Sequence, residues 1–305
     1  MKRLLCLILW LSIPLLAAAE QDITRIDIIA SSGNTAIAEL AKGIQYALVS
    51  AKLDVDTHIQ KPDDYKNTNP ATTLVITIGD NSLPWLSEQK NPFAATVAFH
   101  VSANKFLTQT KSEQRSTALF RDQPLSRQLK LAKFLLPNLK RISVLHSADF
   151  PTPVSKEIQR NLQIGVDEIN IDKNSDWLKS LSLSLRETDA LLGIEDQKIY
   201  NGETIRGILL TTYRQGKSLI GPSKAFVNAG SLASCYTSTD QYLQQLVDMV
   251  TIIIREHRIP EAQYPKAFRV AINKQVGNSL NISIPDESEL SAWLQNNSGE
   301  CGHGC

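Results

Sequence analysis

The sequence predicts an α/β protein of two lobes, each a parallel sheet covered by helices. Short apolar runs alternate with segments of helical periodicity along most of the 305 residues. The runs are continuously apolar, which is typical of parallel strands buried on both faces. The alternation breaks near residues 116–122 and then restarts, which indicates a second lobe.

The elements of the first half can be placed from these patterns. A polar turn at residues 31–35, rich in helix-capping side chains, separates the first strand from the first helix. The expected strands are residues 23–30, 71–80 and 91–101, and the first helix is residues 36–51.

The second half repeats the rhythm, and a late helix has room to return to the first lobe. The expected helices are residues 126–139, 152–163, 201–216 and 238–257, and the expected strands are residues 140–147, 189–195, 218–223 and 267–280, with residues 169–185 combining strand and helix. A chain that crosses between lobes more than once creates a hinge and a cleft. The predicted division is a signal peptide (1–19), a first lobe (20–118 with about 238–262), a second lobe (119–237 with about 263–290) and a flexible tail (291–305).

The N-terminal residues predict a cleaved export signal. Lys2 and Arg3 precede an apolar stretch, residues 4–16, and Ala17-Ala18-Ala19 fits the small-residue rule for cleavage before Glu20. The alternative is an uncleaved membrane anchor, but the stretch is shorter than the ~20 residues that a spanning helix needs. No cysteine stands at the cleavage point for a lipid anchor. We expect an exported protein.

Composition and motifs argue against several function classes. The 32 basic and 31 acidic residues form no block of like charge, so we expect no nucleic-acid or membrane-surface partner. The sequence lacks a G-x-S-x-G elbow, a P-loop and a G-x-G-x-x-G fingerprint, and its histidines show no metal-ligand spacing. We therefore expect no enzyme, cofactor or metal. An exported enzyme remains an alternative class, and it would depend on His100 or His146, which end apolar strands.

The cysteines give a separate set of alternatives. Cys235 is expected to be a buried small side chain. The tail offers Cys301, His303 and Cys305, three soft ligands where a closed zinc site usually has four. Metal binding, a disulfide between the two thiols and a disordered end all stay open for this tail.

Polar side chains at the carboxyl ends of the predicted strands are the candidate ligand site. Ligands of open parallel sheets bind there, next to free helix N-termini. The candidates are Ser31, Ser32, Asn34, Thr35, Asp80, Asn81, His100, Ser147, Asp149, Thr152, Glu195, Asp196, Tyr200, Asn201, Ser223, Phe226 and Tyr236. The polar residues among them have a second interpretation as helix caps. Tyr200, Phe226 and Tyr236 are expected to be apolar walls, or else core residues.

The stretch after the strand at residues 189–195 receives a specific prediction. We expect Glu195, Asp196 and Asn201 to face the cleft, where one carboxylate would suit the ammonium group of a solute. The competing interpretation makes Asn201 only a helix cap and leaves Glu195 and Asp196 in water.

Three stretches, residues 128–147, 189–238 and 264–280, resemble the bacterial family of ABC transporter substrate-binding proteins. The resemblance covers roughly residues 128–280. It implies the type I periplasmic-binding-protein architecture, in which two Rossmann-like lobes joined by crossing strands close on a small solute; better understood relatives bind aromatic amino acids. Family members usually carry a Gly/Ser/Asp-Pro-rich ligand loop after the third strand, whereas this chain has "VAFHVSANKFLTQTKSEQRSTALFRDQPL" there.

The resemblance and the export signal together predict a monomeric periplasmic solute-binding protein. It would capture a small polar or aromatic, amino-acid-like molecule and deliver it to an inner-membrane ABC permease. The alternative is a periplasmic sensor or adaptor of the same fold that acts with a membrane receptor or kinase. The divergent residues 100–124 motivate that alternative, because a changed ligand loop fits a changed role.

Overall fold

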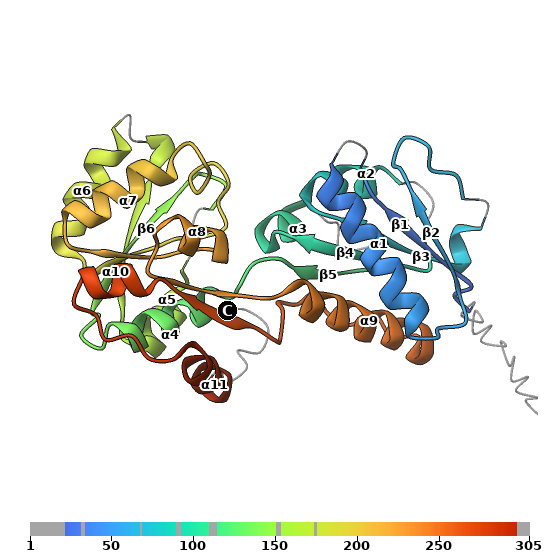
Figure 1. Ribbon diagram of the computed structural model, residues 1–305. Coiled ribbons are helices and arrows are strands. Elements are labelled where there is room, and N and C mark those ends of the chain that lie inside the picture. Colours follow the sequence, from blue (N-terminus) through green and yellow to red (C-terminus); the bar gives the residue numbers. More distant parts are fainter. Residues whose placement is uncertain are drawn as a thin grey trace, which may run out of the picture.

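The computed structural model describes two sheets with helices on both faces of each. Its described residues are 22–31, 34–67, 69–89, 93–109, 115–150, 154–173 and 176–297. The two sheets and their helices lie side by side in Figure 1, with the blue to teal elements on the right and the yellow to red elements mostly on the left. This arrangement confirms the predicted fold class.

The first sheet is parallel throughout, with strand order β2-β1-β3-β4-β5. Its strands are β1 (Arg25–Ile29), β2 (Asp56–Gln60), β3 (Thr73–Ile78), β4 (Ala95–Val101) and β5 (Ser116–Phe120). All six residues of β3 are buried, as expected for a central strand covered on both faces.

Helices cover both faces of this first sheet. One face packs Ile28, Ile76 and Phe99 against α1 (Thr35–Ser50) and the long α9 (Thr239–Glu256). The opposite face packs against α2 (Leu83–Glu88) and α3 (Ala103–Gln109). We call this sheet with α1, α2, α3 and α9 the first lobe.

The second sheet has six strands in the order β11-β10-β9-β8-β6-β7. Its strands are β6 (Arg141–His146), β7 (Gly165–Asn170), β8 (Ala190–Leu192), β9 (Ser218–Ile220), β10 (Ala233–Tyr236) and β11 (Arg269–Ile272). Only β11 runs antiparallel to its neighbour among these strands.

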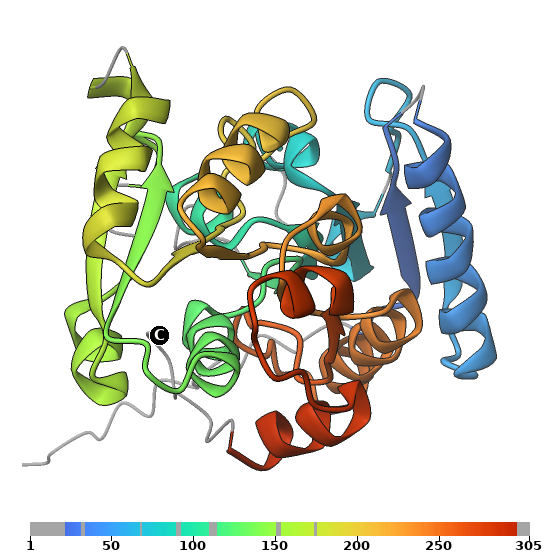
Figure 2. The ribbon, with the colours of Figure 1, turned by 60° about the vertical axis from the view of Figure 1, so that its left-hand side comes forward.

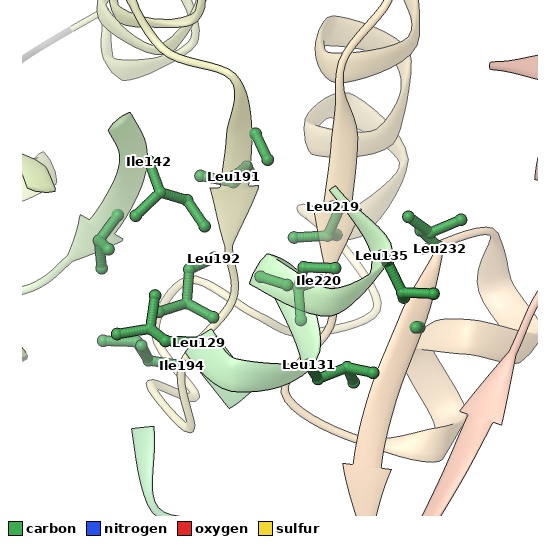
Figure 3. Close-up of a cluster of buried hydrophobic side chains, with 14 of the residues drawn as sticks. Leu129, Leu131, Leu135, Ile142, Leu191, Leu192, Ile194, Leu219, Ile220 and Leu232 are labelled. Carbon is green, nitrogen blue, oxygen red and sulfur yellow. The ribbon is translucent and has the colours of Figure 1, made fainter. Parts of the chain in front are cut away.

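The remaining helices cover the second sheet and with it form the second lobe. They are α4 (Leu125–Leu135), α5 (Lys156–Leu162), α6 (Trp177–Glu187), α7 (Ile205–Arg214), α8 (Lys224–Ala229), α10 (Lys274–Ser279) and α11 (Glu287–Asn297). In Figure 1, α6 and α7 lie above the sheet and α4, α5 and α11 below it. Figure 3 shows leucines of α4 gathered against Leu191 and Leu192 of β8 and Leu219 and Ile220 of β9. Burying these side chains contributes roughly 1.5–3 kcal/mol each.

The chain crosses between the lobes three times. Residues 121–124 lead from β5 to α4, residues 237–238 lead from β10 back to α9, and residues 257–268 lead from α9 to β11. The last crossing first runs along β5, where Gln263 donates its N–H to the carbonyl of Ala118 and accepts from the N–H of Phe120. In Figure 2, the blue α1 and β1 lie on the right and the yellow-green α6 on the left, with the crossing segments between them.

Hydrogen bonds join the three crossings to one another. Gln123 donates to the Thr237 hydroxyl at 2.9 Å, and that hydroxyl donates to the carbonyl of Ala267 at 2.8 Å. Arg127, at the start of α4, donates to Gln123 at 2.6 Å and to the carbonyl of Pro265 at 3.0 Å. The hinge is therefore a connected unit of three segments, because each crossing bonds to at least one other.

Several elements differ from the prediction. The strand predicted over residues 267–280 ends at Ile272, and the helix α10 (Lys274–Ser279) follows it, because Asn273 caps a helix there by accepting the N–H of Val276. The strand β2 was not predicted, because its burial is low and its apolar content small. The predicted break at residues 116–122 contains β5, the last strand of the first sheet. Residues 291–297 belong to α11, whose Leu290 and Leu294 are buried, whereas the sequence analysis places them in a flexible tail. Within the described residues, none of the helices has the length and apolarity to cross a membrane.

Candidate functional site

A cavity of about 270 Å³ lies where the two lobes meet beside the hinge. It opens between α3 of the first lobe and the ends of β8 and β9 of the second. Its lining is Ala103, Asn104, Leu107, Asp122, Gln123, Leu125, Gln128, Phe150, Gly193, Ile194, Glu195, Pro222 and Tyr264. Because both lobes and a hinge crossing contribute, a molecule bound there would contact both lobes and the crossing.

A cluster of charged groups beside the cavity centres on Arg121, the first residue of the hinge crossing. Its guanidinium lies 3.0 Å from the Asp80 carboxylate of the first lobe, and 3.7 Å from the Glu195 carboxylate of the second. Asp122 is 3.9 Å away, and Lys105 makes a second ion pair with Asp80 at 3.2 Å. The Arg121 side chain is 17% exposed, so these interactions are only partly screened by water.

Backbone geometry positions Asp80. The chain leaves β3 through Gly79, whose φ of +76° is a conformation that glycine adopts without strain. Asp80 then accepts the N–H of Ser102, the residue after β4, at 2.7 Å. Burial opposes ionisation of Asp80, but the Ser102 N–H and the Arg121 charge outweigh it and hold its pKa below the usual range.

The other two carboxylates are shifted in the opposite direction. Burial raises the pKa of Asp122 to about 7, and the nearby Glu195 carboxylate adds to the shift. Burial also raises the pKa of Glu195, although Arg121 opposes it. Arg121 keeps its charge, because its carboxylate neighbours raise its pKa despite its own burial. Both raised carboxylates line the cavity, whereas Asp80 does not.

Gln128 of α4 fixes the wall of the cavity next to the hinge. Its side-chain oxygen accepts the Cys235 N–H at 2.9 Å, and its amide nitrogen donates to the Cys235 carbonyl at 3.2 Å. The buried Gln128 side chain thus satisfies both backbone polar groups of Cys235, as a neighbouring strand would. Burial raises the pKa of the Cys235 thiol to about 12, as predicted for a buried cysteine.

Most of the polar candidates follow strands in five segments, residues 31–35, 79–81, 147–152, 195–201 and 221–223, and described residues of four of these come together around this cavity. Residues 79–81 contribute Asp80 to the Arg121 cluster, and the segment after β6 contributes Phe150. Glu195 follows β8 and Pro222 follows β9, and both line the cavity. The described residues of the fifth segment, 31–35, neither line the cavity nor form a hydrogen bond or ion pair with a residue that does.

The acidic residues of the β8 segment have different roles. Glu195 lines the cavity, but the neighbouring Asp196 is 2% exposed and binds the protein's own backbone. The Asp196 carboxylate accepts the N–H of Ser147 at 2.7 Å and that of Lys198 at 3.1 Å. Its two oxygens are therefore already used, and it tethers the loop after β8 to the end of β6.

Asn201 caps a turn, and Tyr200 packs in the core. The Asn201 side-chain oxygen accepts the N–H groups of Glu203 and Thr204 at 2.9 and 3.2 Å, which is the capping role named as the alternative. Tyr200 is 1% exposed and donates to the carbonyls of Leu145 and Leu192. Phe226 packs edge-on against Tyr200, and neither ring lines the cavity.

The other described candidates lie at strand or helix ends and do not themselves line the cavity. Asn34 caps α1 by accepting from Ala36 and Ile37, and Thr35 and Asn81 are exposed. Ser147 is buried behind Asp196, and Ser31 is half-buried. Asp149 pairs with Lys198 at 3.0 Å, and its carbonyl accepts from Asn104 of the first lobe at 2.6 Å. Ser223 precedes α8 without a capping bond, and Tyr236 has Lys224 over its ring.

His100 interrupts β4. Its φ of +58° is unusual for a non-glycine residue, and the pairing of β4 with β5 shifts register there. Its ring packs against Tyr242 of α9 at 5.3 Å. Burial, with Arg121 nearby, lowers the pKa of His100 to about 4. His100 is therefore a neutral packing residue at physiological pH.

Several predictions fall on residues that the structure does not describe. Ser32, Thr152, the signal peptide at residues 1–19 and the tail with Cys301, His303 and Cys305 lie outside the described residues. Among the residues that are described, no group of three or more His, Cys, Asp or Glu side chains could hold a metal ion.

The hinge residues of the site were not among the candidates predicted from the sequence. Arg121 and Asp122 follow the apolar strand "STALF" directly, which is the same signal that marked Asp80 and Glu195. They were not selected because residues 116–122 were interpreted as a break between lobes, not as a strand end. Asn104, Leu107 and Tyr264 gave no comparable signal, because their helix and crossing positions matter only in the folded molecule.

Solved structures with this fold are numerous among binding proteins. The ABC domain from Streptococcus pneumonia in complex with L-Trp is 17% identical, with a TM-score of 0.59, 86% of this chain and 96% of that chain being covered. A ligand-free, open substrate binding protein with adhesive properties from Clostridium difficile is 13% identical, with a TM-score of 0.65 and coverage of 87% and 97%. A conserved domain protein from Vibrio cholerae is 17% identical, with a TM-score of 0.60 and coverage of 88% and 98%.

These likenesses show the fold, and the sequence comparison shows the family. No curated protein matches the chain. A family model described as ABC transporter substrate binding protein matches residues 87–293, well over half of the sequence. The match includes α3, every crossing and the second lobe as far as residue 293, and with them each residue that lines the cavity. The chain therefore belongs to the family of ABC transporter substrate binding proteins.

Proposed function

We propose that this protein is a periplasmic solute-binding protein that captures a small polar or aromatic solute in the cavity between its lobes for an ABC importer. The observation that carries the proposal is the cavity itself, which lies at the hinge and is lined by both lobes and the crossing. Membership of the family supports the binding role. Binding without turnover follows from that role, so a bound solute should be recovered unchanged.

The two sheets with their helices are, in this proposal, the two bodies that close. The first would comprise residues 20–118 with about 238–262, and the second residues 119–237 with about 263–290. The bonds that join Gln123, Thr237 and Arg127 support rotation about one connected hinge. Closure would then shorten the distances across the cavity, where Asn104 already donates to the Asp149 carbonyl.

A thermal-shift screen tests the binding role. We expect one or more compounds from a panel of amino acids, amines, sugars and other small metabolites to raise the melting temperature by several degrees at saturation. Small-angle X-ray scattering of the same complex should show a smaller radius of gyration than the free protein. A panel without any stabilising compound would count against solute binding.

The importer partner and the compartment need their own measurements. An ABC permease and ATPase encoded beside this protein, reconstituted in liposomes, should hydrolyse ATP faster when the loaded protein is added. A receptor or kinase that responds instead would favour the sensor role. Fractionation of cells should place the mature protein, starting near Glu20, in the periplasm.

A further inference from the structure

The hinge end of the cavity holds a carboxylate with an unused oxygen. Asp122 lines the cavity and is 9% exposed. One of its oxygens accepts the N–H of Ala103 at 2.8 Å. The other, Oδ1, is buried and accepts no hydrogen bond among the described residues, because the Arg121 Nε lies 3.9 Å away, beyond hydrogen-bonding distance. A buried carboxylate oxygen without a donor is costly, so a donor from a ligand would remove that cost.

The charge balance around Asp122 is unequal. Asp80, Asp122 and Glu195 supply three carboxylates, and Arg121 and Lys105 supply two cations. Arg121 makes its shortest contact, 3.0 Å, with Asp80, which Lys105 also contacts. The two carboxylates that line the cavity, Asp122 and Glu195, therefore share only the Nε of Arg121, at 3.9 and 3.7 Å.

The charged residues that line the cavity are acidic. Its described residues include two carboxylates and neither a lysine, an arginine nor a histidine. The rest of the surface is mostly apolar, with Leu107, Phe150 and Ile194 as examples. A ligand carboxylate would thus meet two like charges and find no unpaired cation, whereas a ligand cation would meet two opposite charges.

We propose that the solute of this cavity is an organic cation, a primary amine or amidine with an apolar body, whose charged group lies between Asp122 and Glu195 and whose recognition needs no carboxylate. This inference rests on the proposed solute-binding function and narrows the class of solute. The ammonium N–H groups would supply the donor that Oδ1 of Asp122 lacks. A cation bridging Asp122 and Glu195 would also draw the second lobe toward the hinge.

Binding should depend on pH, because both carboxylates must ionise to hold the cation. Asp80 of the first lobe and Arg121 of the crossing act on the charges of the pair, and Tyr242 of α9 and Tyr264 of the last crossing lie near Asp122. Lys105 and His100 act on Asp80 and Arg121 in turn. The two tyrosines, with pKa values raised by burial, and His100, with its pKa lowered, stay neutral between pH 6 and 8. The change in this range comes from the carboxylates, since burial raises the pKa of Asp122 to about 7 and also raises the pKa of Glu195.

Isothermal titration calorimetry with matched ligands tests the inference on the full mature chain. The probes are tryptamine, tryptophan and indole-3-propionate, and 2-phenylethylamine, phenylalanine and 3-phenylpropionate. We expect at least one amine to bind ten times more tightly than its amino acid, and both acids to give no heat of binding. The affinity for that amine should rise severalfold from pH 6 to pH 8.

Two isosteric variants and one control locate the effect. Glu195→Gln and Asp122→Asn should each weaken the amine at least tenfold. Asn at position 122 retains an acceptor for the Ala103 N–H, and the melting curve of each variant checks that it is folded. Glu168→Gln removes an exposed carboxylate on β7 of the second lobe and should leave the affinity unchanged.

The outcomes separate this inference from the proposed function. An amino acid, an acid or a neutral sugar that binds while the amines do not would overturn the cation assignment and leave solute binding intact. Amine binding that survives both variants would also overturn it. If the whole screening panel and the six probes fail to bind, the proposed function is contradicted as well.

Discussion

Two short polar segments of this protein follow buried strands and use their side chains differently. The segment after β8, residues 195–201, continues into the second lobe, and its Asp196 and Asn201 accept hydrogen bonds from backbone N–H groups. The segment after β5, residues 121–124, leaves the first lobe for the second. Its Arg121 pairs with the Asp80 and Glu195 carboxylates. Its Asp122 accepts one backbone N–H, from Ala103, and lines the cavity.

The difference shows when a polar strand end becomes a ligand site. A segment that enters a helix of the same lobe faces free helical and loop N–H groups, which take up its oxygens. A segment that crosses a hinge meets few such groups, so its charges pair with other side chains and stay available to a solute. Glu195 is the exception in the first segment, and it points toward the hinge charge Arg121.

Removing Arg121 should have the largest effect. Arg121→Gln leaves three partly or fully buried carboxylates without their shared cation, which typically destabilises by about 3–5 kcal/mol. The carboxylates can relieve this by taking up protons, so the folded variant binds more protons than the unfolded chain. Its stability should therefore fall as the pH rises from 5 to 8. Urea unfolding at both pH values measures this change. The control is Arg141→Gln, which removes a surface ion pair with Asp167. Equal losses for the two arginines would show that the hinge cluster has no special role.

Removing Asp196 should affect folding more than binding. Asp196→Ala deprives the Ser147 and Lys198 N–H groups of their acceptor in a buried loop, and we expect a loss of about 2–3 kcal/mol. Urea unfolding of Asp196→Ala beside Glu195→Ala tests the contrast, because the Glu195 carboxylate interacts with the side chains of Gln197 and Arg121 and not with a backbone N–H of the described residues. A folded, stable Asp196→Ala protein with weakened solute binding would reverse the roles assigned to the two acids.

Removing the charge of Asp122 should stabilise the free protein at high pH. A carboxyl group whose folded-state pKa is raised to about 7 adds to stability below its unfolded pKa, about 3.9, and that contribution is lost as the pH rises through 7. Asp122→Asn should therefore be about 1–2 kcal/mol more stable than the unmodified protein at pH 8 and equal to it near pH 4. The exposed Asp63→Asn provides the control. Stability that falls at pH 8 would contradict the unfavourable burial of this charge.

Removing the cap at Asn201 should have the smallest effect. Asn201→Ala loses the acceptor for the Glu203 and Thr204 N–H groups, which is worth about 1 kcal/mol. Asn201→Asp keeps an acceptor oxygen and should restore most of the loss. Solute affinity should change in neither variant. An affinity loss in Asn201→Ala alone would return this residue to the ligand site.

The sequence predicted the fold more fully than the site. Apolar runs such as residues 71–80 and 189–195 specify parallel strands locally, and the restart after residue 122 indicates the second lobe. Side-chain direction is not local, so Glu195 and Asp196 could not be told apart from their neighbours alone. Asn104 and Tyr264 reach the cavity only through the packing of α3 and of the last crossing. The strand β5 was hidden because its flanking residues resemble a linker.

The last crossing has a consequence for how the protein behaves before and during folding. The strand β5 is an edge strand of the first sheet, and an unpaired edge can pair with a strand of another molecule. Gln263 occupies part of that edge through its two backbone hydrogen bonds with Ala118 and Phe120. Gln263 lies about 140 residues later in the chain, so the edge of a nascent first lobe stays unpaired until the second lobe is made. During synthesis there is thus an interval in which two chains can associate through β5. A chaperone that binds the nascent chain would prevent this association.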